Sequence, residues 1–208
     1  MKILSTYKVK IKTYNHIFRG TVEVYRHAVD FLIDVCLKEW VEIKKIDLSQ
    51  SRQQYVERLC HFTKKHPETD YDFDKKFYKF PSFLRRAAIN EAIGKVSSYK
   101  SNLKNWEGED PKIRGRKPSF PKAGYSYPCM YRGNMYQQTG KYEARIKVYI
   151  RNTWDWLDIK LRKSDMDYIE RRCKVRKHCS PILQKRGDEW FLDFPMKEYI
   201  ELCDTDVA

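Results

Sequence analysis

The sequence lacks the features that would place it in a membrane or outside the cell. No stretch approaches the roughly 18 consecutive apolar residues of a membrane-spanning helix. The N-terminus, MKILSTYKVKIKTY, has lysine at alternate positions where a signal peptide needs an unbroken apolar run. We therefore expect a cytoplasmic protein with no membrane partner.

Cysteine is present, but its spacing shows no regular disulfide framework. The six cysteines include no C-x-x-C pair, so we expect reduced thiols. The segment CKVRKHC brings Cys173, His178 and Cys179 close together in sequence. This spacing suits no common zinc site, so we expect no metal there.

The familiar catalytic motifs are also absent. The sequence has no glycine-rich phosphate loop, no H-E-x-x-H motif and no nucleophile elbow. Acidic residues cluster only at 68–74 and at the C-terminus, where Asp204 and Asp206 lie two positions apart. Two carboxylates hold Mg²⁺ only with further ligands from elsewhere. We expect no cofactor in this chain, and a small metal-dependent nuclease that uses these two aspartates remains the enzyme alternative.

Positive charge is the dominant feature that is present. The net charge is +14, and the sequence pI is about 9.4. The excess lies in three blocks, with net charges of +5 over residues 1–22, +7 over 111–142 and +6 over 162–186. Clustered charge of this kind predicts an anionic partner, and nucleic acid is the first expectation.

The middle block combines cations with aromatic rings in a segment too rich in proline and glycine for regular structure. Residues 111–133 read PKIRGRKPSFPKAGYSYPCMYRG, and no acidic residue lies between Asp110 and Glu143. Cations follow a phosphate backbone, and flat rings stack on bases. The candidate binding residues here are Arg114, Arg116, Lys117, Lys122, Tyr125, Tyr127 and Arg132. A solvated basic loop is the alternative.

The N-terminal segment STYKVKIK predicts a half-buried strand by its strict alternation. Its apolar side consists of Tyr7, Val9 and Ile11, and its outer side consists of Lys8, Lys10 and Lys12. The three lysines either hold a phosphate backbone or protect an exposed edge strand from aggregation.

Helical periodicity follows from Thr21 onward. A long amphipathic helix is predicted first, then a shorter helix that ends before Pro67. A third helix, PSFLRRAAINEAIGKVSSYKSNLKNW, is predicted to begin at an N-cap, Ser82. Its predicted buried face consists of Ala88, Ala92, Val96, Tyr99 and Leu103.

The third helix also carries candidate base-reading residues. Arg86 and Asn90 lie four positions apart, and their side chains suit guanine and adenine edges in a major groove. Further candidate contacts on this helix are Arg85, Lys95 and Lys100. A solvated helix face would show the same pattern.

Strand patterns return after residue 141 and predict the fold class. Two strands are predicted, YEARIKVYI and WLDIKL. A short helix is then predicted from an N-cap at Ser164 through Arg172. The stretch SPILQKRGDEWFLDFPM is predicted to form a hairpin with its turn at Gly187. The N-terminal strand has no neighbouring partner in sequence, so it must pair with these strands. We expect an α+β fold in which a β-barrel of the wedge or OB-like kind is interrupted by a helical insertion.

This order of parts resembles the N-terminal half of TnpB, the transposon-encoded RNA-guided nuclease related to compact type V CRISPR effectors. The resemblance is carried by the basic N-terminal strand, the third helix, the stretch RGRKPSFPK and the final hairpin. It implies four parts: a first wedge strand at 1–20, a helical recognition lobe at 21–110, the remaining wedge strands at 111–200, and an acidic tail at 201–208.

The resemblance implies that the chain grips a guide RNA scaffold and reads a short motif on duplex DNA beside the target. Arg86 and Asn90 would read the motif, and Arg114, Arg116 and Lys117 would contact the RNA backbone. Target DNA, as a duplex or an RNA–DNA heteroduplex, is the second expected partner.

The nuclease part of that family lies outside this sequence. Its RuvC-like domain would begin just beyond Asp206, whereas the sequence ends at Ala208. We therefore expect this chain to bind nucleic acid without cutting it. Mg²⁺ would be needed only by a RuvC-like half, and a separate RuvC-like polypeptide is a further expected partner. A guide-independent, repressor-like DNA- or RNA-binding protein remains the alternative.

Overall fold

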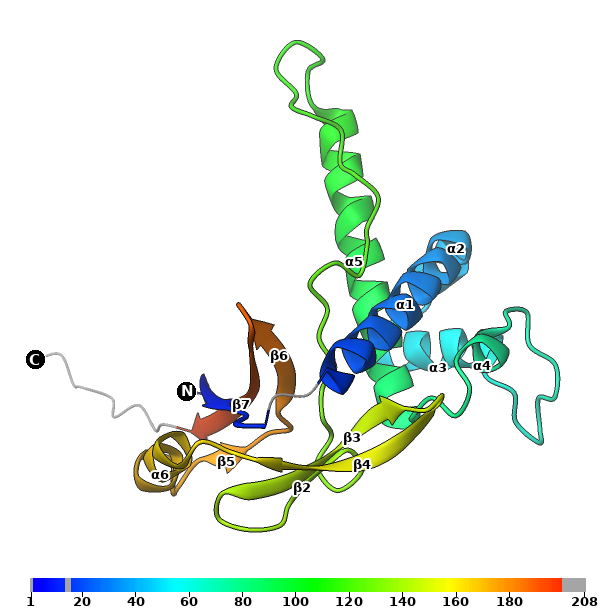
Figure 1. Cartoon of the computed structure of the whole chain (residues 1–208). Coiled ribbons are helices and arrows are strands. Elements are labelled where there is room, and N and C mark those ends of the chain that lie inside the picture. The colour runs from blue at the N-terminus through cyan, green and yellow to red at the C-terminus, as the bar shows by residue number, and fades with distance from the viewer. Residues whose placement is uncertain (1, 14–15, 200–208) are drawn as a thin grey trace, which may run out of the picture. The chain divides into compact units, whose positions relative to one another are not determined.

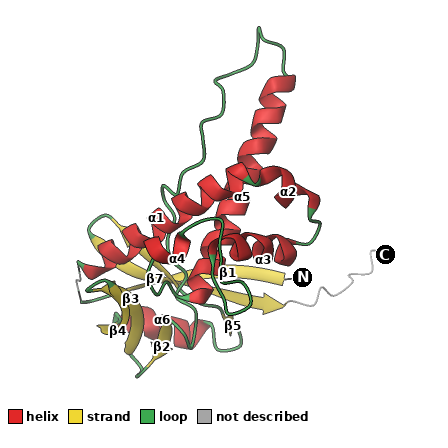
Figure 2. Cartoon of the chain, turned by 90° about the vertical axis from the view of Figure 1, so that its right-hand side faces the viewer, coloured by secondary structure: helices red, strands yellow, loops and turns green. Residues whose placement is uncertain are grey.

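The computed structural model describes residues 2–13 and 16–199, and these residues form a mixed α+β protein with antiparallel sheets (Figures 1 and 2). Cys203, Asp204 and Asp206 lie outside the described residues. Internal contacts divide the chain into two units. We call them the helical unit, residues 19–126 and 149–154, and the strand unit, which comprises the described residues of 1–18, 127–148 and 155–199.

The helical unit is built on two long helices. The elements are α1 (Ile17–Lys38), whose residues from Arg19 onward group with this unit, α2 (Trp40–Lys45), α3 (Ser49–Cys60), α4 (Phe73–Lys76) and α5 (Ser82–Gly108). The apolar positions that predicted α1 are buried, among them Val29, Leu32 and Ile33. A cluster of aromatic rings from α1, α4 and the following loop adds to the core through Phe31, Phe73, Phe77 and Phe80.

The predicted buried face of α5 is largely confirmed. Ala88, Ala92 and Val96 are fully buried, and Tyr99 is 8% exposed. Arg85 lies on the same face, three residues before Ala88, and it is also buried. The helical period therefore predicted the buried positions correctly. Arg85 is in phase with them, so one charged side chain is buried on the same face.

The two predicted N-caps are wrong. The first backbone hydrogen bond of α5 ends on the carbonyl oxygen of Pro81, so Ser82 is already helical and its hydroxyl makes no cap. The later helix α6 (Lys163–Arg172) likewise follows Arg162, and Ser164 lies inside it. The N-cap of α5 is thus Pro81, one residue before Ser82, and that of α6 is Arg162, two residues before Ser164.

In the strand unit, the N-terminal strand pairs with the last strand of the chain. The strands are β1 (Lys2–Lys10), β2 (Tyr136–Gln138), β3 (Glu143–Ile150), β4 (Thr153–Lys160), β5 (Lys177–His178), β6 (Ile182–Arg186) and β7 (Glu189–Tyr199). β1 runs antiparallel to β7 along its whole length, and β6 and β5 also pair with β7. The β6–β7 hairpin turns at Gly187, which has a φ of 57°, as predicted.

A second sheet has the order β2-β3-β4. Ala144, Ile146 and Val148 of β3 are buried in alternation, which confirms the strand predicted from YEARIKVYI. Neither sheet closes on itself among the strands that the structure describes. The tip of the β3–β4 hairpin, residues 149–154, groups with the helical unit, where Tyr149 N donates to Thr21 Oγ1 at 2.9 Å.

The two units and the four expected parts have different boundaries, most of all in the segment after α5. Residues 111–126 group with the helical unit, whereas the sequence-based boundary assigned them to the wedge strands. Between α5 and β2, residues 109–135 contain no helix or strand, consistent with their proline and glycine content. No helix in the described ranges is both long enough and apolar enough to cross a membrane.

Candidate nucleic-acid interface

The predicted binding residues are divided between the two units. The helical unit holds Arg85, Arg86, Asn90, Lys95, Lys100, Arg114, Arg116, Lys117, Lys122 and Tyr125. The strand unit holds Lys8, Lys10, Lys12, Tyr127 and Arg132. Each group is therefore described within its own unit.

The segment after α5, residues 109–126, turns back and runs alongside the helix (Figures 1 and 2). We call it the return segment. The turn begins at Asp110, whose carbonyl oxygen accepts from Ile113 N at 3.0 Å and Arg114 N at 2.9 Å. The indole N–H of Trp106 donates to the carbonyl oxygen of Gly115 at 2.6 Å. The turn is thereby fastened to the last turns of the helix.

Trp106 also positions two of the predicted cations. The Arg114 guanidinium carbon lies 4.1 Å from the centroid of its ring, and the Lys117 ammonium lies 5.8 Å from it. A cation over an indole face is attracted by the ring quadrupole, and its charge is not cancelled. In the described part of the chain, no salt bridge involves Lys112, Arg114, Arg116, Lys117 or Lys122.

The far end of the return segment is anchored by polar contacts to α1 and α5. Ala123 N donates to Asp30 Oδ1 at 2.6 Å, and Arg26 Nε donates to the carbonyl oxygen of Ser126 at 3.0 Å. Ser126 Oγ also donates to the carboxylate of Glu91. The return segment is therefore fixed at both ends, although it has no regular structure.

A groove of about 670 Å³ lies between α5 and the return segment. The residues of α5 that line it are Glu91, Gly94, Lys95, Ser98, Tyr99 and Asn102, and those of the return segment are Pro118, Ser119, Pro121 and Lys122. Lys95 lies 3.6 Å from Glu91, while the exposed Lys122 has no such partner among the described residues. The groove thus offers amide and hydroxyl groups beside an uncompensated lysine.

Two rings of the return segment face solvent. Phe120 is 69% exposed and Tyr125 is 90% exposed. One side of Phe120 is supported by Tyr99, whose ring centroid lies 5.4 Å away at an interplanar angle of 31°. Exposed rings beside cations are the groups that stack on unpaired bases. Sequence reasoning missed Phe120 and Trp106, although both are aromatic residues next to the basic run.

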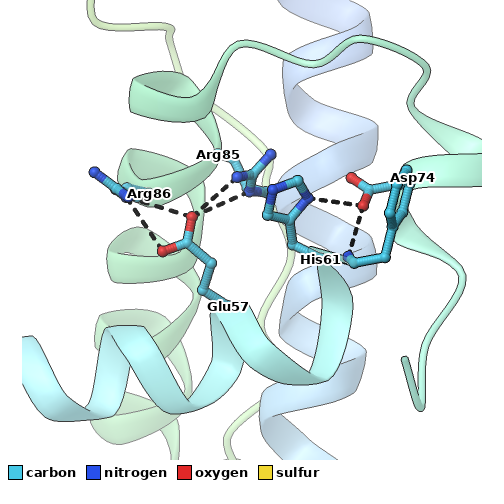
Figure 3. Close-up of polar contacts among 6 residues, drawn as sticks. Glu57, His61, Asp74, Arg85 and Arg86 are labelled. Carbon is cyan, nitrogen blue, oxygen red and sulfur yellow. Dashed lines mark hydrogen bonds and ion pairs between the residues drawn. The ribbon is translucent and has the colours of Figure 1, made fainter. Parts of the chain in front are cut away.

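The beginning of α5 is arranged differently (Figure 3). Glu57 of α3 accepts from Arg85 Nη2 at 3.0 Å and from Arg86 Nε at 3.2 Å. Arg85 is only 4% exposed, so it joins α3 to α5 and does not present its charge to a ligand, contrary to the prediction. Arg86 is half-exposed, and Asn90 is exposed one turn further along.

The predicted residues of the strand unit are partly engaged by their own unit. Lys8 and Lys12 are exposed, whereas Lys10 is half-buried and forms an ion pair with Glu189. The hydroxyl of Tyr127 donates to the carbonyl oxygen of Lys185 at 3.3 Å. Lys8 and Lys12 therefore remain the more available lysines of this strand.

Arg132 is exposed but held in place. Its Nε donates to the carbonyl oxygen of Cys179 at 3.0 Å, and its guanidinium lies 5.2 Å from the Tyr136 ring. Partial desolvation of its ring and the positive charge of Arg132 lower the pKa of the exposed His178 below its ordinary value of 6.5. His178 is therefore neutral near neutral pH, and Arg132 carries the positive charge beside it.

Metal-ligating side chains do not gather anywhere in the described residues. No three His, Cys, Asp or Glu side chains lie close enough there to hold an ion. Cys173 is buried, Cys179 is half-buried and His178 is exposed. Burial raises the pKa of Cys36 and Cys60 to about 12, so these two thiols stay protonated.

Comparison with known proteins finds matches over the part of the chain that carries the candidate interface. The Aq_aa04 family model matches residues 5–150. A protein of Aquifex aeolicus (strain VF5), described as "Uncharacterized protein aq_aa04", is 34% identical over 121 residues, which cover 53% of this chain and 68% of that protein. Every predicted binding residue, from Lys8 to Arg132, lies within the range that the family model matches.

Proposed function

The chain belongs to the Aq_aa04 family, and we propose that it is the nucleic-acid-binding half of a TnpB-like RNA-guided DNA endonuclease. In this proposal it binds a guide RNA scaffold and reads a short motif on target-adjacent duplex DNA. Cutting of the DNA would depend on a RuvC-like nuclease half with its Mg²⁺. This chain would bind the nucleic acids and would not cut them. Its place of action would be the cytoplasm.

The return segment is the observation that carries this proposal. Five basic side chains follow one another there without a salt bridge among the described residues, and Trp106 fixes two of them in place. Exposed rings stand beside them. A fixed, uncompensated row of cations with stacking surfaces is suited to a nucleic-acid backbone with unpaired bases.

The order of secondary structure supports the same proposal. A basic strand opens the chain, helices follow, and the strand finds its partner in β7 at the far end. A bridge between Ile11 and Leu161 also joins the end of β1 to the end of β4. This bridge links the two sheets of the strand unit, and it supports the finer proposal that they form a barrel-like wedge.

Motif reading is assigned in this proposal to Asn90 and the exposed end of Arg86. Asn90 is solvent-exposed, and Arg86 uses its Nε for Glu57. The terminal nitrogens of Arg86 are then the part available to a ligand. Their partners would be base edges of the DNA duplex or phosphates beside them.

The test is to express the chain together with DNA that encodes the flanking transposon end, purify it in moderate salt, and sequence the bound nucleic acid. One enriched, structured RNA is the expected result. A random mixture of RNAs, or duplex DNA that stays bound after RNase treatment, would overturn the RNA-guided proposal. That result would favour the guide-independent, repressor-like alternative, because the return segment suits any phosphate backbone.

A further inference from the structure

A second basic site lies at the other end of α5. A pocket of about 590 Å³ opens between α3, the turn that follows it, and the beginning of α5. Its lining consists of Gln54, Glu57, Arg58, His61, Thr63, His66, Ser82, Arg85 and Arg86. All of these residues belong to the helical unit, and none belongs to the return segment.

The lining is cationic although it contains a carboxylate. Three guanidinium groups face one carboxylate, which leaves a formal charge of +2 with both histidines neutral. Glu57 is shared by Arg85 at 3.0 Å and Arg86 at 3.2 Å, so its charge is already engaged within the protein. Arg58 is exposed and forms no salt bridge within the described part of the chain. Its charge is therefore available to a ligand.

The histidines of the pocket are positioned by their own partners. Asp74 Oδ2 lies 2.8 Å from His61 Nδ1 and also accepts from Phe62 N at 3.1 Å (Figure 3). This contact occupies Nδ1 and leaves Nε2 of His61 for a ligand. His66 is held by a tight turn in which its N–H donates to Thr63.

We infer that this pocket binds a phosphate group carried on a nucleotide or nucleic acid. Arginine and imidazole donors from α3, from the turn after it and from α5 suit a tetrahedral anion. The hydroxyl groups of Thr63 and Ser82 add further donors to the lining. A volume of about 590 Å³ exceeds one phosphate and falls in the usual range for ligand pockets, so the phosphate comes with part of its nucleotide.

The experiment is a titration of the full chain with inorganic phosphate at constant ionic strength, followed by NMR of the histidine rings. Saturable shifts are expected for His61 and His66. No shift is expected for His27, which is exposed and lies outside the pocket lining. Equal shifts with sodium chloride alone would overturn the inference.

Two variants separate this site from general electrostatics. Arg58→Ala is expected to weaken phosphate binding about tenfold, because a charge-assisted hydrogen bond is lost. Lys44→Ala removes an exposed charge outside the pocket and is expected to leave affinity unchanged. Unchanged affinity in a folded Arg58→Ala chain would overturn the inference, and Arg58→Gln provides a second variant that preserves side-chain length.

Oligonucleotide probes identify the source of the phosphate. A dinucleotide with a 5′-phosphate that competes better than its 5′-hydroxyl form points to a terminal phosphate. Equal competition points to a backbone phosphodiester. The pocket does not depend on the proposed function: loss of guide RNA co-purification would overturn that function, whereas the phosphate titration would still report on this site.

Discussion

The two ends of α5 hold positive charge in two different ways. At its beginning, Arg85 and Arg86 share the carboxylate of Glu57, and Arg85 is buried. Beyond its end, Arg114 and Lys117 lie over the ring of Trp106 and form no salt bridge with another described residue. A carboxylate fixes a cation and cancels its charge, whereas an aromatic ring fixes it and leaves the charge for a partner.

The largest effect is expected when the paired end is broken. Glu57→Ala leaves the guanidinium of Arg85 buried without its counter-charge, and it should destabilise the fold by about 3–5 kcal/mol. Urea denaturation followed by circular dichroism measures this loss. Glu42→Ala, which breaks the exposed pair between α2 residues Glu42 and Lys45, should cost less than about 1 kcal/mol. Equal losses in the two variants would show that the Glu57 contacts are no more than surface pairs.

The unpaired end should respond in binding and not in stability. Replacing Arg114, Arg116 and Lys117 together by Ala should weaken RNA binding about 10- to 100-fold and reduce the slope of log K against log salt by about 2. Fluorescence anisotropy with a single-stranded RNA at several salt concentrations measures both quantities.

A matched triple variant supplies the control for this loss of charge. Lys44, Lys64 and Lys65 are exposed in the same unit but outside the return segment. Their replacement by Ala removes the same charge and should leave the salt slope unchanged. A similar loss in both triples would reduce the return segment to one part of a diffuse basic surface.

Phe120→Ala should have a smaller effect on the same binding. Stacking on an aromatic ring contributes about 1–3 kcal/mol per base, and we expect the lower end because Tyr99 already supports one side of the ring. RNA affinity should fall about fivefold, while thermal stability stays within about 0.5 kcal/mol of wild type. Tyr78→Ala, at another exposed ring of the helical unit, should leave affinity unchanged. Duplex RNA that loses as much affinity as single-stranded RNA would contradict base stacking.

Sequence periodicity predicted the pairing of β1 and the buried face of α5, but not the side-chain contacts at the two ends of α5. Alternation in β1 and the lack of a neighbouring partner predicted its pairing with a C-terminal strand, because an isolated strand leaves backbone groups unpaired. The buried face of α5 followed from its helical period. Arg85 is in phase with that face, but its partner lies 28 residues earlier in the chain, and no local pattern predicts that pairing.

The candidate site was predictable in composition and not in arrangement. The acid-free run between Asp110 and Glu143 identified the basic segment directly. The positioning of Arg114 by Trp106 depends on the chain turning back on itself, and the anchoring of Ser126 depends on Glu91, 35 residues earlier. Turn geometry of this kind arises from tertiary contacts, which a single sequence does not display.

The smallest effect is expected at Gly94, between the two ends of α5. A Cβ built there meets nothing within 4 Å, so packing does not require the glycine. Gly94→Ala should therefore stabilise the protein by about 0.4–1 kcal/mol, since alanine loses less backbone entropy in a helix. Thermal denaturation measures the gain.

Gly94 also lines the groove beside the return segment, so we expect the gain in stability to come with a loss in RNA affinity of about threefold. Gly108→Ala is the matched control, because its Cβ also meets nothing and it lies outside the groove. A Gly94→Ala chain that is more stable and binds RNA equally well would show that RNA does not contact the α5 side of the groove. RNA would then be bound by the unpaired cations of the return segment alone, without a contribution from the groove side of α5.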